Sequence, residues 1–376
     1  MPSAPLPRGL ALSGGGFRAT LFHLGALWRL NELGWLRSLD IVTSVSGGSI
    51  INGVLAVRWA ELTWTPIAGG GERATNFADK IAQPVRDFCK RSIDVSSVVI
   101  GGLSPFSTIA DQVADAYDEH LYDGATLQSL PAPVTGQVPR FLFYASSLQT
   151  GSSVRMERKR FADYKIGEIP NPNLSLARVV GASSAFPPVL SPVRFQFDPS
   201  SWQPLPGAEL FANEALRKEA VLTDGGVYDN LGLEAIYDRC ETVLVSDASA
   251  PFDIVTQAAS DPAGQLNRVN AVMMEQTRAL RRRAVVSEFT SGRRKGTFWG
   301  IGTRIGDYQL PDALVKDTTR TGSLELIRTR LNRFSPEEQG HLINWGYALA
   351  DAAMRRHVLT GAPAVAAALP DPAFPL

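Results

Sequence analysis

Residues 9–18 read GLALSGGGFR, a short apolar run that ends in three consecutive glycines. An apolar run that stops at a turn signal is typical of a buried strand. Beyond the glycines, large apolar side chains recur every three or four residues, at Phe17, Leu21, Leu24 and Trp28. That spacing places them on one face of a helix. The stretch therefore predicts a strand, a tight glycine turn and a helix.

The same order of elements repeats immediately. Residues 39–45 read LDIVTSV, and their β-branched side chains predict a second buried strand. This run stops at Ser46-Gly47-Gly48, after which Ile50, Val54 and Val57 continue with helical spacing. Strands that alternate with helices favour a parallel sheet covered by helices. We therefore predict a three-layer α/β/α fold with a largely parallel central sheet.

Later segments extend this prediction along the chain. Strand character returns at four places, residues 140–146, 193–197, 220–223 and 242–246. Helical patterns occupy residues 111–121, 324–334 and 336–358, and Ser335 followed by Pro336 is a typical helix start. We expect a single domain over residues 1–376, with a lid or insertion at about 61–139 and a helical C-terminal extension at about 322–376.

Composition excludes several classes of protein. The 376 residues are 44% hydrophobic, with 37 basic and 37 acidic side chains. A chain of this length can fold without disulfide or metal crosslinks. Its balanced charge excludes a dedicated nucleic-acid binder, which shows a basic footprint. Cys89 and Cys240 stand far apart and fit neither a zinc motif nor a disulfide framework.

The distribution of apolar residues along the chain predicts where in the cell the protein is found. No stretch reaches the ~18 consecutive apolar residues of a membrane span. The apolar N-terminal stretch is interrupted by the glycines at 14–16 and by Arg18, which a signal peptide would not contain. We therefore expect a cytoplasmic protein that is at most peripheral at a membrane surface.

The glycine turn at residues 14–16 has a structural and a functional interpretation. A tight turn alone would need residues that adopt positive φ angles. A binding loop would use the same glycines to bring an anion or oxyanion close to backbone N–H groups, next to the dipole of the following helix. The turn by itself does not separate these two interpretations.

A dinucleotide fingerprint is an alternative for the same loop. Gly14, Gly16 and Ala19 match the pattern G-x-G-x-x-[GA] between a strand and a helix. The acidic residue that should end the second strand is missing, because Glu32 and Asp40 both precede that strand. A nucleotide-binding module that uses Gly14–Ala19 remains the alternative function.

The second motif is Ser44-Val45-Ser46-Gly47-Gly48. It nearly matches the nucleophile elbow G-x-S-x-G, in which a sharp strand-to-helix turn presents a serine hydroxyl at the end of a sheet. Ser44 takes the place of the first glycine, and Gly48 supplies the second. The alternative is a serine that only caps the following helix. If the elbow is present, Ser46 is the candidate nucleophile.

A serine nucleophile needs a base, and the sequence offers a carboxylate. Asp224-Gly225-Gly226 follows the apolar run at residues 221–223, although Asp-Gly there could also mark a hairpin turn. The histidines offer less, since none of the four is expected on a loop after a late strand; they are His23, His120, His341 and His357. A pair formed by Ser46 and Asp224 therefore fits better than a histidine triad.

The order of these motifs resembles that of the patatin-like phospholipase family. The glycine loop, the serine elbow and the Asp-Gly-Gly segment are joined by ASSAFPP at residues 182–188, which is similar to the small-residue segment that precedes the aspartate in that family. The resemblance covers residues 10–235, with Ser44 as one departure.

The resemblance implies a lipid acyl hydrolase, of phospholipase A or lysophospholipase type, with a serine–aspartate dyad and neither cofactor nor catalytic metal. Ser46 would be the nucleophile and Asp224 the general base. Gly15 and Gly16 would supply oxyanion-hole N–H groups, while Gly14 and Arg18 would shape that loop. An acyltransferase that uses the same dyad is a further alternative.

A cluster of cations lies further along the chain. Its members are Arg278, Arg281, Arg282, Arg283, Arg293, Arg294 and Lys295, with Glu288 as the acidic residue among them. One interpretation is a peripheral contact with anionic lipid headgroups. The other is a solvated helix face whose cations pair with acids elsewhere.

Overall fold

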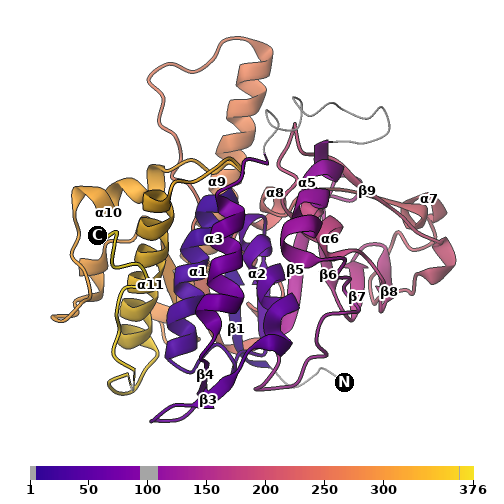
Figure 1. Ribbon diagram of the computed structural model, residues 1–376. Coiled ribbons are helices and arrows are strands. Elements are labelled where there is room, and N and C mark those ends of the chain that lie inside the picture. The colour runs from indigo at the N-terminus through magenta and orange to yellow at the C-terminus, as the bar shows by residue number, and fades with distance from the viewer. Residues whose placement is uncertain (1–5, 94–108, 364) are drawn as a thin grey trace.

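The computed structural model describes residues 6–93, 109–363 and 365–376, and a central sheet organises them (Figure 1). Ten strands of the described chain join in this sheet. Its parallel part runs in the spatial order β12 (Lys295–Gly300), β11 (Cys240–Asp247), β1 (Leu6–Leu12), β2 (Ile41–Ser44) and β5 (Arg140–Ser147). The predicted α/β fold with a largely parallel central sheet is confirmed.

The sheet continues beyond β5 with antiparallel strands. On one edge of β5 lie, in order, β6 (Ser153–Glu157), β7 (Arg160–Asp163) and β8 (Gly167–Pro170). On its other edge β10 (Glu219–Asp224) pairs with the end of β5 and with β9 (Val193–Gln196). Sequence patterns indicated β9 and β10 but missed β6, β7, β8 and β12.

Helices α1 (Gly16–Glu32), α2 (Gly47–Arg58) and α11 (Pro336–His357) gather on one side of the sheet (Figure 1). α1 and α11 approach closely because each has a glycine at the crossing. A Cβ added at Gly25 would fall 1.9 Å from the Ile343 carbonyl oxygen, and one added at Gly346 would fall 1.9 Å from that of Phe22. α11 thus belongs to the helical layer and packs on α1 along its length.

The other face of the sheet has its own small apolar cluster, which includes Val45, Tyr144 and Val245. It is covered by the segment that follows α8 (Gly226–Asp229), with Leu231, Leu233 and Ile236, and by the last turns of α9 (Pro262–Thr290), where Val285 is fully buried. The rest of α9 leaves the sheet and projects from the molecule (Figure 1).

The predicted lid or insertion at 61–139 contains a hairpin and several helices. They are η1 (Trp59–Glu61), β3 (Trp64–Pro66), β4 (Glu72–Ala74), η2 (Ala78–Ala82), α3 (Gln83–Cys89), α5 (Ile109–Tyr117) and η3 (Asp118–Tyr122). Several of these elements pack on α1 and α2, so this stretch contributes to the helical layer. Residues 94–108 lie outside the described part. A lid function for the stretch stays a prediction.

The remaining helical elements are short. They are α6 (Leu176–Ser183), η4 (Pro199–Ser201), α7 (Glu214–Lys218), η5 (Ile305–Tyr308), α10 (Thr319–Ser323) and η6 (Leu324–Leu326). The helix expected at residues 324–334 is wrong beyond this last turn. Several carbonyls of this segment accept hydrogen bonds from α1 instead of from N–H groups of a helix of their own. Those of Glu325 and Ile327 accept from Arg18, and that of Arg330 accepts from the Phe17 N–H.

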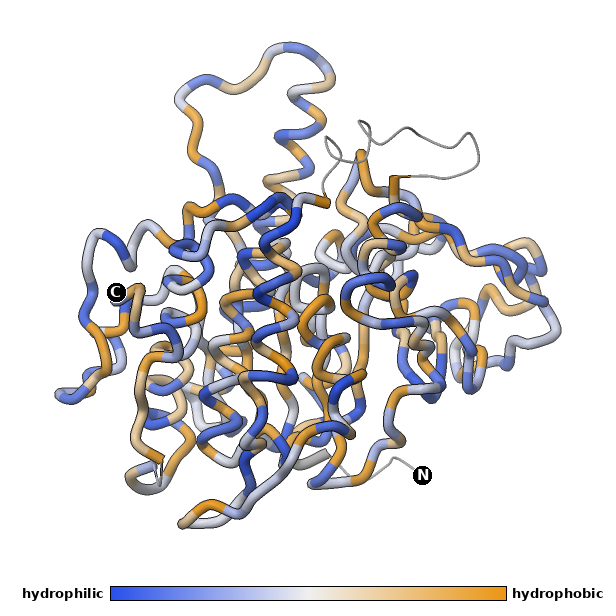
Figure 2. Tube along the Cα trace, viewed as in Figure 1, coloured by the Kyte–Doolittle hydropathy of each residue, from blue (hydrophilic) through white to orange (hydrophobic). Residues whose placement is uncertain are grey.

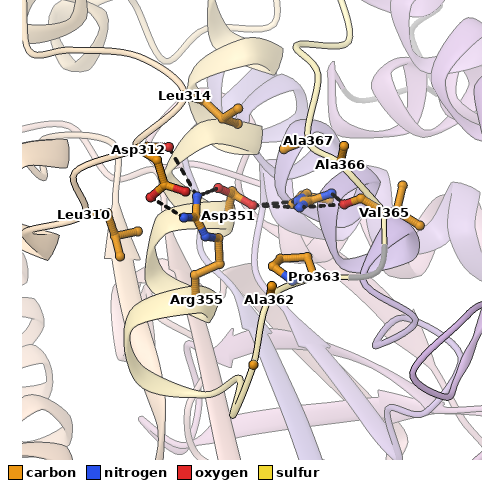
Figure 3. A pocket seen from close by; sticks show the side chains of 12 residues that line it. Leu310, Asp312, Leu314, Asp351, Arg355, Ala362, Pro363, Val365, Ala366 and Ala367 are labelled. Atoms are coloured by element: carbon orange, nitrogen blue, oxygen red, sulfur yellow. Dashed lines mark hydrogen bonds and ion pairs between the residues drawn. The ribbon is translucent and has the colours of Figure 1, made fainter.

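A buried ion network joins α1 to α11 (Figure 3). The Arg29 guanidinium donates to the Asp351 carboxylate at 2.8 Å, and each side chain is 1% exposed. Arg355 reaches the same carboxylate at 3.1 Å. Arg29 also donates to the Val365 carbonyl and so ties down the chain after α11. Figure 3 shows these groups around a pocket. The charged groups hydrogen-bond to each other and to the chain after α11, which gives the network a structural role.

Breaking this network should destabilise the fold. We expect Asp351→Asn to lower the free energy of unfolding by about 3 kcal/mol or more, since it removes the buried carboxylate that pairs with both Arg29 and Arg355 and leaves Arg29 only its pair with the more exposed Glu32. Glu72→Gln breaks the more exposed ion pair with Arg37 and should change that free energy by less than about 1 kcal/mol. Urea unfolding of both variants measures this, and equal effects would contradict the structural role of the network.

Candidate active site

Ser46 occupies a strained turn between β2 and α2. Its φ angle is 51°, in the left-handed region that residues other than glycine rarely adopt. The turn also requires glycines, because a Cβ at Gly47 would fall 2.1 Å from the Gly16 carbonyl oxygen and one at Gly48 would fall 2.5 Å from that of Leu12. This is the geometry of a nucleophile elbow. Retained backbone strain at such a position points to function.

The register of β5 brings Asp224 to Ser46. β2 ends at Ser44, which lies opposite Phe143 of β5. β10 runs the other way along the same edge of β5 and ends at Asp224, opposite Ala145. The two strands therefore meet end to end, which brings Ser46, just beyond the end of β2, toward Asp224, the last residue of β10. Two positions 178 residues apart in sequence thus share one site.

The Asp224 carboxyl is 2% exposed and only half satisfied. Its Oδ1 accepts the Gly226 N–H at 2.7 Å. Its Oδ2 is buried, and no group of the described residues donates to it with the distance and angle of a hydrogen bond. Burial raises the pKa of Asp224 from 3.8 to about 6, against smaller lowering effects of the Gly226 N–H and the nearby Ser46 hydroxyl. Such an oxygen can take a proton near neutral pH.

The glycine loop lies against the elbow. Gly15 and Gly16 have φ angles of 144° and 57°, so both positions require glycine. The Gly14 N–H donates to the Asn230 carbonyl at 3.1 Å and is therefore occupied. Within the described chain, the N–H groups of Gly15 and Gly16 have no such partner. They lie at the N-terminus of α1, where N–H groups can stabilise a developing negative charge.

Arg18 acts on this loop from the inside. Its side chain is 1% exposed, and its guanidinium donates to the carbonyls of Ala248, Glu325 and Ile327, each at 2.7 Å. Burial lowers the pKa of Arg18 from 12.5 to about 10. The side chain therefore clamps two distant segments onto the glycine loop. A shaping role agrees with these contacts, and its assignment to the oxyanion hole stays a prediction.

None of the four histidines, all of which are described, hydrogen-bonds to Ser46 or Asp224. His23 is fully buried, and its ring bonds the Ser246 hydroxyl and the Ser13 carbonyl. Burial lowers its pKa to about 4, so it is neutral at pH 7. His120, His341 and His357 contact rings or charges elsewhere. Among the described residues no three His, Cys, Asp or Glu side chains group as metal ligands.

Residues 10–62 match the family model described as patatin-like phospholipase; they contain the end of β1, the glycine loop, β2 and the elbow. Over this stretch, the chain is similar to the patatin-like phospholipase family. Enzymes of this family are typically serine hydrolases with a serine–aspartate dyad. No curated protein sequence matches the chain.

The fold is similar to that of a solved structure. Human GIVD cytosolic phospholipase A2 in complex with methyl γ-linolenyl fluorophosphonate has a TM-score of 0.50 and 14% identity over 92% of this chain. The present chain spans only 57% of that protein. VipD from Legionella pneumophila has a TM-score of 0.39 and 16% identity, covering 94% of this chain and 68% of its own.

The structure adds polar residues to the family motifs. The Ser46 N–H donates to the carbonyl and to the hydroxyl of Ser183, both at 3.1 Å. Ser183 continues through Ser49 to Ser44, the residue that replaces the first glycine of the elbow. These hydroxyls form a buried network behind Ser46. The small-residue segment at 182–188 was a signal for Ser183, whereas Ser49 had no sequence signal.

Most of the cation cluster is neutralised. Arg278 pairs with Glu275, Arg281 with Asp229 and Glu234, Arg293 with Glu288, and Lys295 with Glu241, while Arg294 donates to the Cys240 carbonyl. Arg282 and Arg283 have no partner among the described residues. The cluster is therefore not one free basic patch, and its contact with a membrane stays a prediction. No helix of the described chain is long and apolar enough to span a bilayer.

The raised pKa of Asp224 makes a prediction for stability. Because the pKa rises from 3.8 to about 6 on folding, the contribution of Asp224 to stability is full below pH 3.8 and is lost as pH rises through about 6. Asp224→Asn removes the buried charge. We therefore expect its free energy of unfolding to exceed that of the native chain by about 3 kcal/mol at pH 8 and to equal it near pH 4. Urea unfolding at both pH values measures this, and a less stable variant at pH 8 would contradict it.

Proposed function

We propose that this protein is a lipid acyl hydrolase of phospholipase A or lysophospholipase type, which cleaves carboxylic esters through an acyl-enzyme on Ser46. The observation that carries the proposal is the buried, unpartnered Oδ2 of Asp224 beside a serine held at a strained elbow. The match of residues 10–62 to the patatin-like phospholipase family model supports a lipid ester as the substrate.

In the first half-reaction, Asp224 Oδ2 takes the proton of the Ser46 hydroxyl as Ser46 Oγ attacks the ester carbonyl carbon. The carbonyl oxygen becomes an oxyanion, which the N–H groups of Gly15 and Gly16 stabilise. The tetrahedral intermediate collapses, the bond to the alcohol breaks, and the departing alkoxide takes the proton back from Asp224. Ser46 is left acylated.

The second half-reaction repeats these steps with water. Asp224 takes one proton from the water molecule as the water oxygen attacks the acyl carbonyl carbon. Collapse of the second intermediate returns the proton to Ser46 Oγ and releases the fatty acid. An alcohol in place of water would make the same dyad an acyltransferase.

Burial explains how a carboxylate can act as the base. An ordinary aspartate, with a pKa of about 4, is a weak base for a hydroxyl. Burial raises the pKa of Asp224 to about 6. The carboxyl is then ionised at neutral pH and still accepts a proton more readily than an exposed aspartate.

The nucleotide-binding alternative finds less support. Glu32 pairs with Arg29 and accepts the Tyr347 hydroxyl, while Asp40 accepts the backbone N–H groups of Arg8 and Gly136. Both acids are thus engaged within the fold. β2 ends at Ser44 instead of the acidic residue that would bind a ribose.

Loss of either dyad member should abolish turnover. We expect Ser46→Ala and Asp224→Asn each to reduce hydrolysis of a phospholipid or a short-chain ester by about 10³-fold or more, because the acyl-enzyme needs both groups. A fluorophosphonate probe should label the native chain and fail to label Ser46→Ala. Product release measured by mass spectrometry gives the rates.

Histidine variants are the matched control for the base. Replacement of His120, His341 or His357 should leave most of the activity, because none of them contacts the dyad. One histidine variant that falls to the level of Ser46→Ala would overturn Asp224 as the base. Substantial turnover by Ser46→Ala would overturn the proposed function itself.

The pH dependence should follow ionisation of Asp224. The base must be deprotonated, so kcat/KM should rise with pH through an apparent pKa of about 6. At pH 5 it should be about one tenth of its value at pH 8. A profile measured on a neutral, water-soluble ester avoids titration of the substrate. An activity that stays constant from pH 8 to pH 5 would contradict a base with this pKa.

A further inference from the structure

Between β11 and β12 the chain leaves the sheet as an arm, residues 250–280, which consists of a loop and the first turns of α9. The arm projects from the molecule (Figure 1). α9 is 29 residues long, about 44 Å at 1.5 Å per residue. The fully buried residue of α9 is Val285, which lies beyond the arm. The arm therefore extends from the body with little packing to cover it.

The arm carries an exposed apolar stripe. More than half of the large apolar side chains exposed in the described chain lie between residues 254 and 286. On α9 the stripe consists of Leu266, Val269, Met273 and Leu280, exposed by 64%, 53%, 62% and 58%. Intervals of three, four and seven residues place them on one helix face. Figure 2 shows hydrophobic stretches (orange) between hydrophilic ones (blue) along the projecting arm.

Both ends of the arm are fixed at the candidate active site. At its start, the Ala248 carbonyl accepts from Arg18, which clamps the glycine loop. Just past its end, Arg281 pairs with Asp229 and Glu234 and lies over the Tyr228 ring at 5.4 Å. Asp229 and Tyr228 belong to α8, the helix that directly follows Asp224. The arm is thus attached to both sides of the dyad.

Exposed apolar side chains also border the dyad itself. Phe186 is 53% exposed and follows Ala185, whose carbonyl accepts the Asp224 N–H. Val227 is 37% exposed and follows Gly226, whose N–H binds the Asp224 carboxylate. Leu326 is 69% exposed and lies between the two residues whose carbonyls bind Arg18. Apolar surface therefore occurs on the arm and on the segments that form the site.

We propose that the arm is a docking element for a lipid surface and lays its apolar stripe into the boundary between headgroups and acyl chains. A helix with an apolar face and cations beside it binds in this way, and the exposed Arg282 and Arg283 follow the stripe without acidic partners among the described residues. Docking would bring the dyad to the surface that holds its substrate. This inference rests on the proposed function for its choice of partner.

Vesicle flotation tests the arm directly. The probe is a vesicle of mixed phosphatidylcholine and phosphatidylglycerol, and Ser46→Ala serves as the background so that the lipid is not consumed. In the stripe variant, Val269→Asp and Met273→Asp place two charges on the apolar face. In the control variant, Asn267→Asp and Ala271→Asp add the same charges at exposed positions on another face of the same helix.

We expect the stripe variant to bind vesicles about tenfold or more weakly than the background, and the control variant to stay within about twofold. With Ser46 restored, both should hydrolyse a water-soluble short-chain ester at the native rate. Equal losses in both variants, or no vesicle binding by the native chain, would overturn the docking element. A native dimer that the stripe variant dissociates, without vesicle binding, would assign the stripe to self-association instead.

The two proposals fail in different ways. Vesicle binding without hydrolysis of any ester would leave the docking element standing and overturn the proposed function. Hydrolysis of the soluble ester without vesicle binding would leave the proposed function standing and overturn the docking element.

Discussion

The candidate dyad depends on one edge of β5, along which β2 and β10 meet end to end. A parallel strand and an antiparallel strand share this edge, so their last residues converge at Phe143 and Ala145. Main-chain hydrogen bonds along β5 fix both ends, and neither Ser46 nor Asp224 needs a flexible loop to reach the other. Sites held on strands in this way are positioned more accurately than sites held on loops.

Local sequence was sufficient for β1, β2, β5 and β11 of the parallel part of the sheet and for the elbow, while β12 was missed. Runs such as residues 9–13 carry apolar side chains that are buried on both faces, and glycines mark where those strands stop. The meander β6, β7 and β8 was missed because its strands are short and rich in charges such as Arg155 and Arg160. Residues 324–334 were predicted as a helix, yet contacts with Arg18 and the glycine loop hold them in an irregular conformation. Such tertiary contacts leave no periodic trace in a sequence.

Within the candidate site, the motifs predicted which residues come together but not their burial or their hydrogen-bond partners. The Asp-Gly-Gly motif indicated Asp224, while its burial and unpartnered oxygen follow from packing between β10 and β5. Ser183 and Ser49, behind the elbow, are ordinary residues in sequence and act only through distant partners. Their hydroxyls satisfy polar groups that burial would otherwise leave unpaired, which is how a polar interior stays compatible with a stable fold.

The glycine crossing of α1 and α11 has a consequence for synthesis on the ribosome. The glycine loop begins α1, whereas α11, against which α1 packs through Gly25 and Gly346, is synthesised later, because 321 residues separate these two glycines. Contacts this distant in sequence form slowly and late. The apolar face that α1 turns toward α11 is exposed until then. Nascent chains therefore carry the family motifs long before the hydroxyl of Ser46 lies in a finished site, and they need protection from aggregation during that interval.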